Sequence, residues 1–260
     1  MIAVVEPGWA STIQDLGRPG FAHLGVSPAG MVDPGLGTLV NRLVGNPSGA
    51  ALIETCGGLV LRAERPVLVA STAESGPRIV AAGETYRVAG VDERLWHYVA
   101  VRGGVTAAVA LGSASADTLS GIGPAPLRAG DRLLAGPDPG TELTTDLAPL
   151  APLGDRARVS AGPRADWVEV DWAAPLTVAD VSRVGVRLAG ARIGSRRAVE
   201  LPSEGLVRGA IQAPPGGELV MMLADHPTTG GYPVIAVVHP DDVAVVAQHR
   251  PGTTLRLHLT

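Results

Sequence analysis

Three acidic residues, Glu54, Glu204 and Asp225, are the candidates for proton transfer in this chain. Asp225 directly follows the apolar run Leu-Val-Met-Met-Leu-Ala, which predicts a carboxylate at the end of a buried strand. Burial disfavours the charged form of a carboxylate unless N–H donors or an arginine compensate. Glu54 also has apolar neighbours, so it requires either an arginine partner or a role in a site. Carboxylates in such surroundings are suited to general acid–base chemistry.

Arg18 is the first candidate for binding an anion. It lies between Gly17 and Pro19 in a loop rich in polar residues, where a rigidly held guanidinium suits a carboxylate or a phosphate. An ion pair with Asp15 that only holds the loop together is an equally good interpretation.

Gly230 and Gly231 are the second candidate. Paired glycines occur where the backbone needs positive φ or where another group must approach the main chain closely. A concave run of N–H groups would suit a carboxylate or a developing oxyanion. The alternative is that residues 228–233, Thr-Thr-Gly-Gly-Tyr-Pro, only connect two buried strands.

Common catalytic and metal-binding motifs are absent from the sequence. Ser27 lies in Gly-x-Ser-x-x-Gly rather than in the nucleophile elbow Gly-x-Ser-x-Gly, so it is not assigned as a nucleophile. None of the six histidines pairs with another at metal-ligand spacing, and no metal is expected. His226 adjoins Asp225, but adjacency in sequence does not make a triad.

Short strands are expected to position most of these residues. The 34 glycines and 22 prolines among short Val, Leu and Ile runs predict an all-β fold with a few short helices. Asp33-Pro34 predicts a helix cap before an apolar helical face that ends at Gly45, and His239-Pro240 predicts the start of a second helix. Residues 11–20 are expected to be irregular, and residues 176–188 to hold a short helix before a strand. Strands are expected at 2–5, 66–70, 85–88, 95–101, 105–110, 218–224 and 255–259, and residues 51–62 are expected to form two strands joined by a Gly-Gly bulge or turn.

Composition excludes several classes of function. The net charge is −4 and the cationic residues, all arginine, are scattered, which disfavours nucleic-acid binding. The absence of lysine excludes Schiff-base chemistry and a P-loop lysine. No apolar run approaches the roughly 20 residues of a membrane helix. With Cys56 as the single cysteine and no signal-peptide pattern after Met1, we expect a cytoplasmic protein without disulfides.

Two segments carry a specific resemblance. They are Thr12-Ile-Gln-Asp-Leu-Gly-Arg-Pro-Gly20 with residues 27–33, and residues 203–233 with their Ser-Glu-Gly, Ala-Ile-Gln, Leu-Ala-Asp and Thr-Thr-Gly-Gly-Tyr-Pro motifs. Together they resemble the allophanate hydrolase subunit 2 family, also called the KipA-like or biotin-dependent carboxyltransferase family. That family includes the C subunit of bacterial ATP-dependent 5-oxoprolinase and is similar to part of the carboxyltransferase domain of urea carboxylase.

The resemblance implies two closely packed β domains with cyclophilin-like barrel architecture. With residues 136–155 as a linker rich in Pro, Gly and Thr, the expected boundaries are 1–140 for the N-terminal domain and 156–260 for the C-terminal barrel. It also implies an obligate KipI-like (allophanate hydrolase subunit 1) partner and, for 5-oxoprolinase, a LamB/YcsF-like subunit. Such a complex couples ATP hydrolysis to the opening of 5-oxoproline to glutamate, while biotin chemistry would require a separate carrier protein.

Motif placement assigns the candidate roles. Glu54, Glu204 and Asp225 form the catalytic set, the two glutamines recognise an amide, and Arg18 with the glycine pair binds an anion. The substrate-binding set is Gln14, Asp15, Arg18, Ser27, Gln212, Thr228, Thr229, Gly230, Gly231 and Tyr232. We expect these residues, which come from both ends of the chain, to line one cleft that a partner protein completes.

One departure from the family pattern concerns the loop after Asp225. The family usually has Arg-Gln where this chain has His226-Pro227, so a fixed cation is replaced by a titratable side chain. Three functions are compatible with the residues: an ATP-dependent amide hydrolase subunit, a biotin-dependent carboxyltransferase subunit, and a KipI-binding regulatory protein without catalysis of its own.

Overall fold

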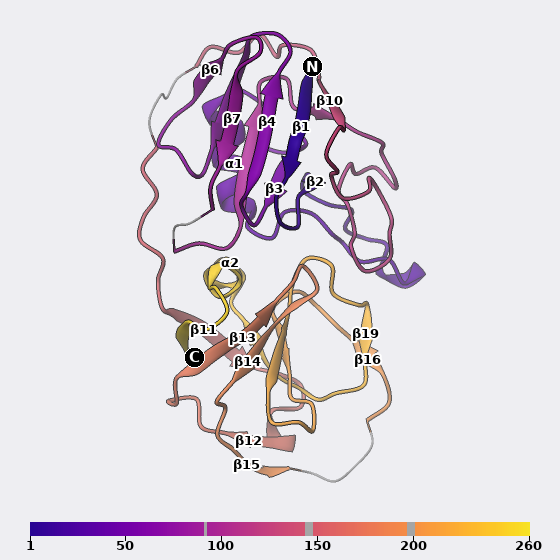
Figure 1. Ribbon diagram of the computed structural model, residues 1–260. Helices are drawn as coiled ribbons and strands as arrows, with labels where there is room; N and C mark the ends of the chain where they lie inside the picture. The colour runs from indigo at the N-terminus through magenta and orange to yellow at the C-terminus, as the bar shows by residue number, and fades with distance from the viewer. Residues whose placement is uncertain (91–92, 144–147, 197–200) are drawn as a thin grey trace. The chain divides into compact units, whose positions relative to one another are not determined.

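The computed structural model of the 260-residue chain describes residues 1–90, 93–143, 148–196 and 201–260 (Figure 1). By its internal contacts the chain divides into two compact units. The first unit comprises residues 1–18, 29–117 and 121–152, and the second comprises residues 19–28, 118–120 and 153–260. The short segments 19–28 and 118–120 therefore belong with the second unit. The domain boundaries expected from the sequence remain a prediction.

The first unit is built from two five-stranded sheets. One sheet has the strand order β7-β4-β1-β10-β9, and the other has the order β2-β3-β8-β5-β6. Their pairings are antiparallel throughout the registers that the structure describes. The strands are β1 (Ile2–Pro7), β2 (Thr12–Gln14), β3 (Leu52–Thr55), β4 (Leu59–Ala63), β5 (Val67–Ser71), β6 (Arg78–Val80), β7 (Thr85–Val88), β8 (His97–Val101), β9 (Val105–Thr106) and β10 (Arg132–Ala135).

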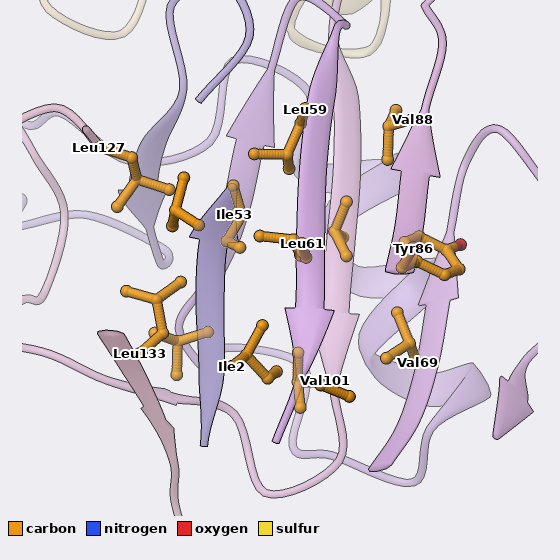
Figure 2. Packing of buried hydrophobic residues seen from close by; sticks show 14 of the residues in the cluster. Ile2, Ile53, Leu59, Leu61, Val69, Tyr86, Val88, Val101, Leu127 and Leu133 are labelled. Atoms are coloured by element: carbon orange, nitrogen blue, oxygen red, sulfur yellow. The ribbon is translucent and has the colours of Figure 1, made fainter. Parts of the chain in front are cut away.

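Alternating side chains of both sheets form the core of this unit. Ile2 of β1 and Leu61 of β4 gather with Ile53 of β3, Val69 of β5 and Val101 of β8 (Figure 2). Successive side chains of a strand point to opposite faces, so the neighbours of these core residues must lie on the other face of their sheet. Burial of each such side chain contributes about 1.5–3 kcal/mol to stability.

Helix α1 (Pro34–Leu43) packs on β8, β5 and β3. Its N-cap is Asp33, whose Oδ1 accepts a hydrogen bond from Leu36 N at 3.1 Å, which confirms the helix and the cap that the sequence predicts. Since the core covers one face of β3 and β8 and α1 packs against the same two strands, every residue in both is buried. Polar residues on these two strands are therefore kept away from water.

The second unit contains a closed seven-stranded barrel in the order β11-β20-β17-β18-β14-β13-β21 (Figure 1). The barrel closes where β11 pairs with β21 in parallel. The all-β prediction with a barrel and a few short helices is thus confirmed. The elements of this unit are η1 (Ala22–Leu24), β11 (Arg156–Ala161), η2 (Ala165–Trp167), β12 (Val168–Val170), β13 (Leu176–Val181), β14 (Gly185–Ala189), β15 (Ile193–Arg196), β16 (Glu204–Gly205), β17 (Ala210–Gln212), β18 (Leu219–Met222), β19 (Thr229–Gly230), β20 (Val234–Val238), η3 (Pro240–Asp242), α2 (Val243–Gln248) and β21 (Thr254–Leu259).

Two local predictions are wrong. The segment 176–188, expected to hold a short helix, forms the antiparallel strands β13 and β14. Leu176 and Val178 are buried, with a half-buried residue between them, as a barrel strand requires. The segment 11–20, expected to be irregular, contains β2, because pairing with β3 satisfies its backbone. Over the described part of the chain, no helix combines the length and apolar character needed to cross a membrane.

Arg158 of β11 and Asp242 of η3 hold the second helix on the barrel. Asp242 Oδ2 accepts hydrogen bonds from Arg158 N at 2.7 Å and Nε at 2.8 Å, while Oδ1 accepts from Nη2 at 2.9 Å. The hydrogen bonds from the Arg158 side chain are the main reason why the pKa of Asp242 falls from 3.8 to about 2.

This lowered pKa gives an expected pH dependence of stability. A carboxyl group with a lowered folded-state pKa stabilises the fold above its unfolded-state pKa, and that contribution is lost as the pH falls through about 2. In urea unfolding, the native chain should therefore lose more stability between about pH 5 and about pH 2 than Asp242→Asn does. Equal losses in both proteins would contradict this role of Asp242.

Candidate functional site

The face of the second sheet opposite the core carries a row of buried polar side chains on β2, β3 and β8. Ile13, Ile53 and Val99 point into the core. Their strand neighbours must point to the other face, and the register places Thr12 opposite Glu54, and Glu54 opposite Tyr98. Gln14, two residues after Thr12, shares this face. We call Gln14, Thr12, Glu54 and Tyr98 the polar row.

Glu54 is fully buried and accepts two hydrogen bonds through Oε2. The donors are the backbone N–H of Val32 and the hydroxyl of Tyr98, each at 2.8 Å. Tyr98 in turn accepts from Asp33 N at 2.7 Å. Burial, followed by the charges of Glu54 and Asp33, raises the pKa of Tyr98 well above its ordinary value. The sequence left two alternatives for Glu54, an arginine partner or a role in a site. In the structure, Glu54 is bonded to the buried hydroxyl of Tyr98 and to the backbone of Val32, just before α1.

Gln14 and Asp15 fix the segment 110–116 against β2. Gln14 Nε2 donates to Thr12 Oγ1 at 2.9 Å and to Ala116 O at 3.0 Å. The Asp15 carboxylate accepts from Ser113 Oγ and Ser115 Oγ, both at 2.5 Å, and from Ala114 N at 2.7 Å. The carboxylate of Asp15 is thus bonded to hydroxyl and backbone donors.

Arg18 is 2% exposed and binds the same segment. Its Nε donates to Ala110 O at 3.2 Å, and its Nη2 donates to Ser115 O. One interpretation of the sequence was an ion pair between Arg18 and Asp15 that holds the loop together. Arg18 instead binds the two backbone carbonyls. Gln14, Asp15, Arg18 and residues 110–116 form one buried cluster in the first unit, which we call the Arg18 cluster.

Asp225 forms a fully buried ion pair with Arg183 in the second unit. Arg183 Nε and Nη2 donate to its two carboxylate oxygens at 2.9 and 2.8 Å. The backbone N and the hydroxyl of Thr118 donate to Oδ2 at 2.8 and 2.7 Å. Nearby, Ser27 Oγ donates to Ala224 O at 2.9 Å. The arginine and N–H donors that a buried Asp225 requires are therefore both present, and they secure residues 118–120 within this unit.

Glu204 lies in the ribbon formed by β16 and β19. Arg164 binds it through Nε, 3.2 Å from Oε2, and through Nη2 to Oε1, and its guanidinium also lies 5.1 Å from the centre of the Trp167 ring. The hydrogen bonds from Arg164 lower the pKa of Glu204. A carboxylate with a lowered pKa is a weaker base, so proton transfer by Glu204 would require Arg164 to move away.

The predicted segment 228–232 contacts Gln212 and Leu206. Gln212 Nε2 donates to Tyr232 O at 3.0 Å, and Thr228 O accepts from Leu206 N at 2.9 Å. Gly230 pairs with Glu204, while Thr229 and Tyr232 are exposed. Neither Gly230 nor Gly231 has a positive φ, so close approach explains the first glycine: a Cβ on Gly230 would lie 2.6 Å from Gln212 Nε2. The segment is a paired ribbon rather than a simple connection.

This close approach makes Gly230→Ala a specific test of the ribbon. The added methyl would also lie 2.9 Å from Leu206 Cδ1, so we expect it to displace the Gln212 amide and lower stability by about 1–3 kcal/mol. Gly231→Ala is the matched control, since its nearest atom, Leu201 O, is 3.8 Å away. Thermal or urea unfolding measures both. Equal effects of the two substitutions would contradict the packing argument.

The structure thus groups the predicted site residues into three sets. Gln14, Asp15, Arg18 and Glu54 lie in the first unit, Ser27 and Asp225 lie together in the second, and Glu204, Gln212 and residues 228–232 form the ribbon region of the second. The single shared cleft remains a prediction. Within the described ranges there is no group of three or more His, Cys, Asp or Glu that could hold a metal ion.

The residues that bind the candidates were not predicted from the sequence. Arg183 and Thr118 bind Asp225, Arg164 binds Glu204, Tyr98 binds Glu54, and Ser115 binds Asp15. For Asp225 there was a signal, because a carboxylate after a buried strand needs an arginine or N–H donors. The sequence offered no way to choose Arg183 among 21 cationic residues.

Comparisons with known proteins agree with this architecture. The family model for the carboxyltransferase domain, subdomains A and B, matches residues 24–259. The chain is 31% identical to the C subunit of 5-oxoprolinase from Escherichia coli (strain K12), over 95% of this chain and 87% of that protein. It is 28% identical to urea amidolyase of Lachancea kluyveri, over 97% of this chain and 16% of that protein. The crystal structure of TTHA0988 has a TM-score of 0.86 and 33% identity, and covers 100% of this chain and 55% of that one.

The antiparallel sandwich, the closed barrel and their buried polar clusters therefore define a carboxyltransferase-type fold. The chain belongs to the family of carboxyltransferase domains, subdomains A and B, which confirms the resemblance found in the sequence. It spans about 55% of the solved chain of TTHA0988 and 16% of the urea amidolyase, so the activities of those longer proteins are not transferred whole to this chain.

Proposed function

We propose that this chain is a subunit of a multi-subunit, ATP-dependent hydrolase of cyclic amides, of the 5-oxoprolinase type, which converts 5-oxoproline to glutamate. The observation that carries the proposal is the 31% identity to the C subunit of 5-oxoprolinase over 95% of this chain and 87% of that protein. Similarity over nearly the whole of both proteins, rather than over one domain, supports a shared role.

A lactam resists hydrolysis until its oxygen or nitrogen is derivatised, so the proposed enzyme must bind a small polar amide, exclude water and stabilise an anion. In this proposal the Arg18 cluster binds substrate, and Gln212 with residues 228–232 forms a second polar region. Glu54, Glu204 and Asp225 are the candidates for proton transfer. Among these, Glu54 hydrogen-bonds the Tyr98 hydroxyl, whereas Asp225 and Glu204 are each bound by an arginine. Glu54 is the candidate tested first, because its carboxylate lies against a buried hydroxyl.

The proposal includes partner proteins. A KipI-like protein and a LamB/YcsF-like protein would complete the enzyme, and ATP would bind to the complex. The Escherichia coli relative is named as one subunit of 5-oxoprolinase, which supports an assembly of several chains.

Reconstitution tests the proposed function. The chain is co-purified with the KipI-like and LamB/YcsF-like proteins of its own genome, and phosphate release is measured with and without 5-oxoproline. We expect phosphate release to require 5-oxoproline, ATP and all the subunits. If the full set of subunits assembles and shows no 5-oxoproline-dependent phosphate release, the proposed function is wrong.

A biotin-dependent carboxyltransferase is the second candidate, favoured by the name of the matching family and by the urea amidolyase relative. It requires a separate carrier with a biotinylated lysine. Carboxyl transfer from such a carrier to an amide, in place of phosphate release with 5-oxoproline, would select it. Tight KipI binding that survives substitution of all three candidate acids, without either reaction, would instead select the non-catalytic regulatory role.

A further inference from the structure

Among the residues that the structure describes, two buried polar atoms of the Arg18 cluster have no hydrogen-bond partner. They are Oε1 of Gln14, a residue that is 0% exposed, and Nη1 of Arg18, which is 2% exposed. Native proteins satisfy nearly all buried polar atoms, and each exception requires an explanation. Here an unpartnered acceptor and an unpartnered cationic donor occur in one cluster, on side chains bound to the adjacent carbonyls of Ala116 and Ser115.

The orientations of both side chains are fixed by their other contacts. A carbonyl oxygen can only accept, so the Gln14 atom 3.0 Å from Ala116 O must be the NH₂ group, and the unpartnered atom must be the oxygen. Arg18 is held through Nε by Ala110 O and through Nη2 by Ser115 O, which leaves Nη1. The cluster therefore offers one acceptor and one charged donor in defined chemical roles.

The charge of Arg18 strengthens this argument. Among the described residues, the polar groups that contact its guanidinium are two backbone carbonyls, neither of which carries a formal charge. The nearby carboxylate of Asp15 is bonded to Ser113, Ala114 and Ser115 instead. A buried cation is normally compensated by an anion. A carboxylate bound at Nη1 would give the guanidinium, whose contacts among the described residues are neutral carbonyls, a directly bonded anionic partner.

The backbone around Arg18 is also specialised. Leu111, a bulky residue, has a φ of 52° in the turn that presents Ala110 O to Arg18, and bulky residues rarely adopt this left-handed conformation. Gly123 packs so closely that a Cβ would lie 2.1 Å from Ser115 O and 3.1 Å from Arg18 Nη2. Strained backbone is typical of sites where a precise geometry serves a ligand.

We propose that Arg18 Nη1 binds the carboxylate of a small cyclic amide and that Gln14 Oε1 accepts the ring N–H of the same molecule. The substrate class is thus a lactam that carries a carboxylate near its nitrogen, and an uncharged lactam is a poor ligand. This inference deepens the proposed function and rests on it for the identity of the natural substrate. The binding itself is measurable without turnover.

Binding of matched probes to the full chain, alone and in complex with its partner subunits, tests the inference. The probes are L-5-oxoproline, 2-pyrrolidinone (the same ring without the carboxylate), N-methyl-5-oxoproline (without the N–H) and bicarbonate. By calorimetry we expect 5-oxoproline to bind about 10- to 100-fold more tightly than 2-pyrrolidinone, since a hydrogen bond to a charged group is worth that factor. The N-methyl probe should bind about 10-fold more weakly than 5-oxoproline.

The variants are Arg18→Gln, Gln14→Leu and the control Arg132→Gln, which changes an exposed arginine of the same unit that is paired with Glu64. We expect Arg18→Gln to weaken 5-oxoproline binding about 10- to 100-fold and to abolish the preference over 2-pyrrolidinone, while Arg132→Gln changes neither. Gln14→Leu should abolish the preference for 5-oxoproline over its N-methyl derivative. The comparison of probes on the unmutated chain needs no variant, so it tests carboxylate recognition even if Arg18→Gln does not fold.

Several results would overturn the inference. They are no binding of 5-oxoproline in either preparation, equal binding of 5-oxoproline and 2-pyrrolidinone, unchanged binding in a folded Arg18→Gln, or Arg18-dependent binding of bicarbonate without any of 5-oxoproline. Failure of the proposed function is distinct from these: a complex that binds 5-oxoproline through Arg18 but releases no phosphate supports the site and rejects the reaction.

Discussion

Replacement of Asp225 by alanine is expected to lower the free energy of unfolding by about 3–5 kcal/mol, because it removes one partner of a buried ion pair. Both Asp225 and Arg183 are almost completely buried, and the guanidinium binds the carboxylate through two nitrogen atoms. The substitution would leave that cation without an anion, and would leave the two donors of Thr118 without their acceptor. Urea unfolding at pH 7, followed by circular dichroism, measures the loss.

Two further variants isolate the cause of this loss. Glu218→Ala is the control, since Glu218 pairs with Arg187 in the same unit at 3.6 Å and both side chains are largely exposed. It should change stability by less than about 0.5 kcal/mol. The double variant Asp225→Leu/Arg183→Met removes both charges, so it should recover much of the stability lost in Asp225→Ala. If the double variant were as unstable as the single one, the unpaired charge would not be the cause.

The ion pair also bears on the catalytic hypothesis for Asp225. Four hydrogen bonds from Arg183 and Thr118 already occupy its carboxylate. To accept a proton from a substrate, Asp225 would have to give up at least one of these bonds. The structure therefore gives Asp225 a clear architectural role, whereas its role in proton transfer stays a prediction that turnover by Asp225→Asn would test.

Local patterns in the sequence were sufficient for some of the regular elements, such as α1 and β21. Asp33-Pro34 before an apolar helical face specifies the start of α1 through the chemistry of the cap and the fixed φ of proline. The alternation of Leu255, Arg256 and Leu257 specifies β21, in which Leu255 and Leu257 are buried and Arg256 is exposed. These signals act within a few residues, so a single sequence contains them completely.

The partners of the site residues could not be predicted, because they depend on strand register. Asp15 meets Ser115 across 100 residues of chain, and Asp225 meets Thr118 across 107. A shift of one residue in any intervening strand pair would reverse which side chains face each other. Similarly, the residue types around Glu54 showed that it needed a partner, but only the pairing of β3 with β8 brings Tyr98 opposite it.

Glu54→Gln is expected to reduce turnover of 5-oxoproline by the reconstituted complex about 100-fold or more, the usual loss when a general acid or base is removed. Stability should fall by only about 1 kcal/mol, since the glutamine carbonyl can still accept from Val32 N and Tyr98 Oη. Turnover assays alongside urea unfolding measure both quantities in the same protein.

Two companion variants separate chemistry from packing in the polar row. Glu54→Leu leaves the Val32 N–H and the Tyr98 hydroxyl without their acceptor, and should cost about 3 kcal/mol of stability. Tyr98→Phe removes one donor to Glu54 and the acceptor of Asp33 N, and should cost about 1–3 kcal/mol while the carboxylate is retained. If Glu54 transfers protons, turnover will follow the carboxylate: high in folded Tyr98→Phe and low in Glu54→Gln. If turnover instead follows stability across the three variants, Glu54 serves the fold alone, and proton transfer must come from another group of the complex.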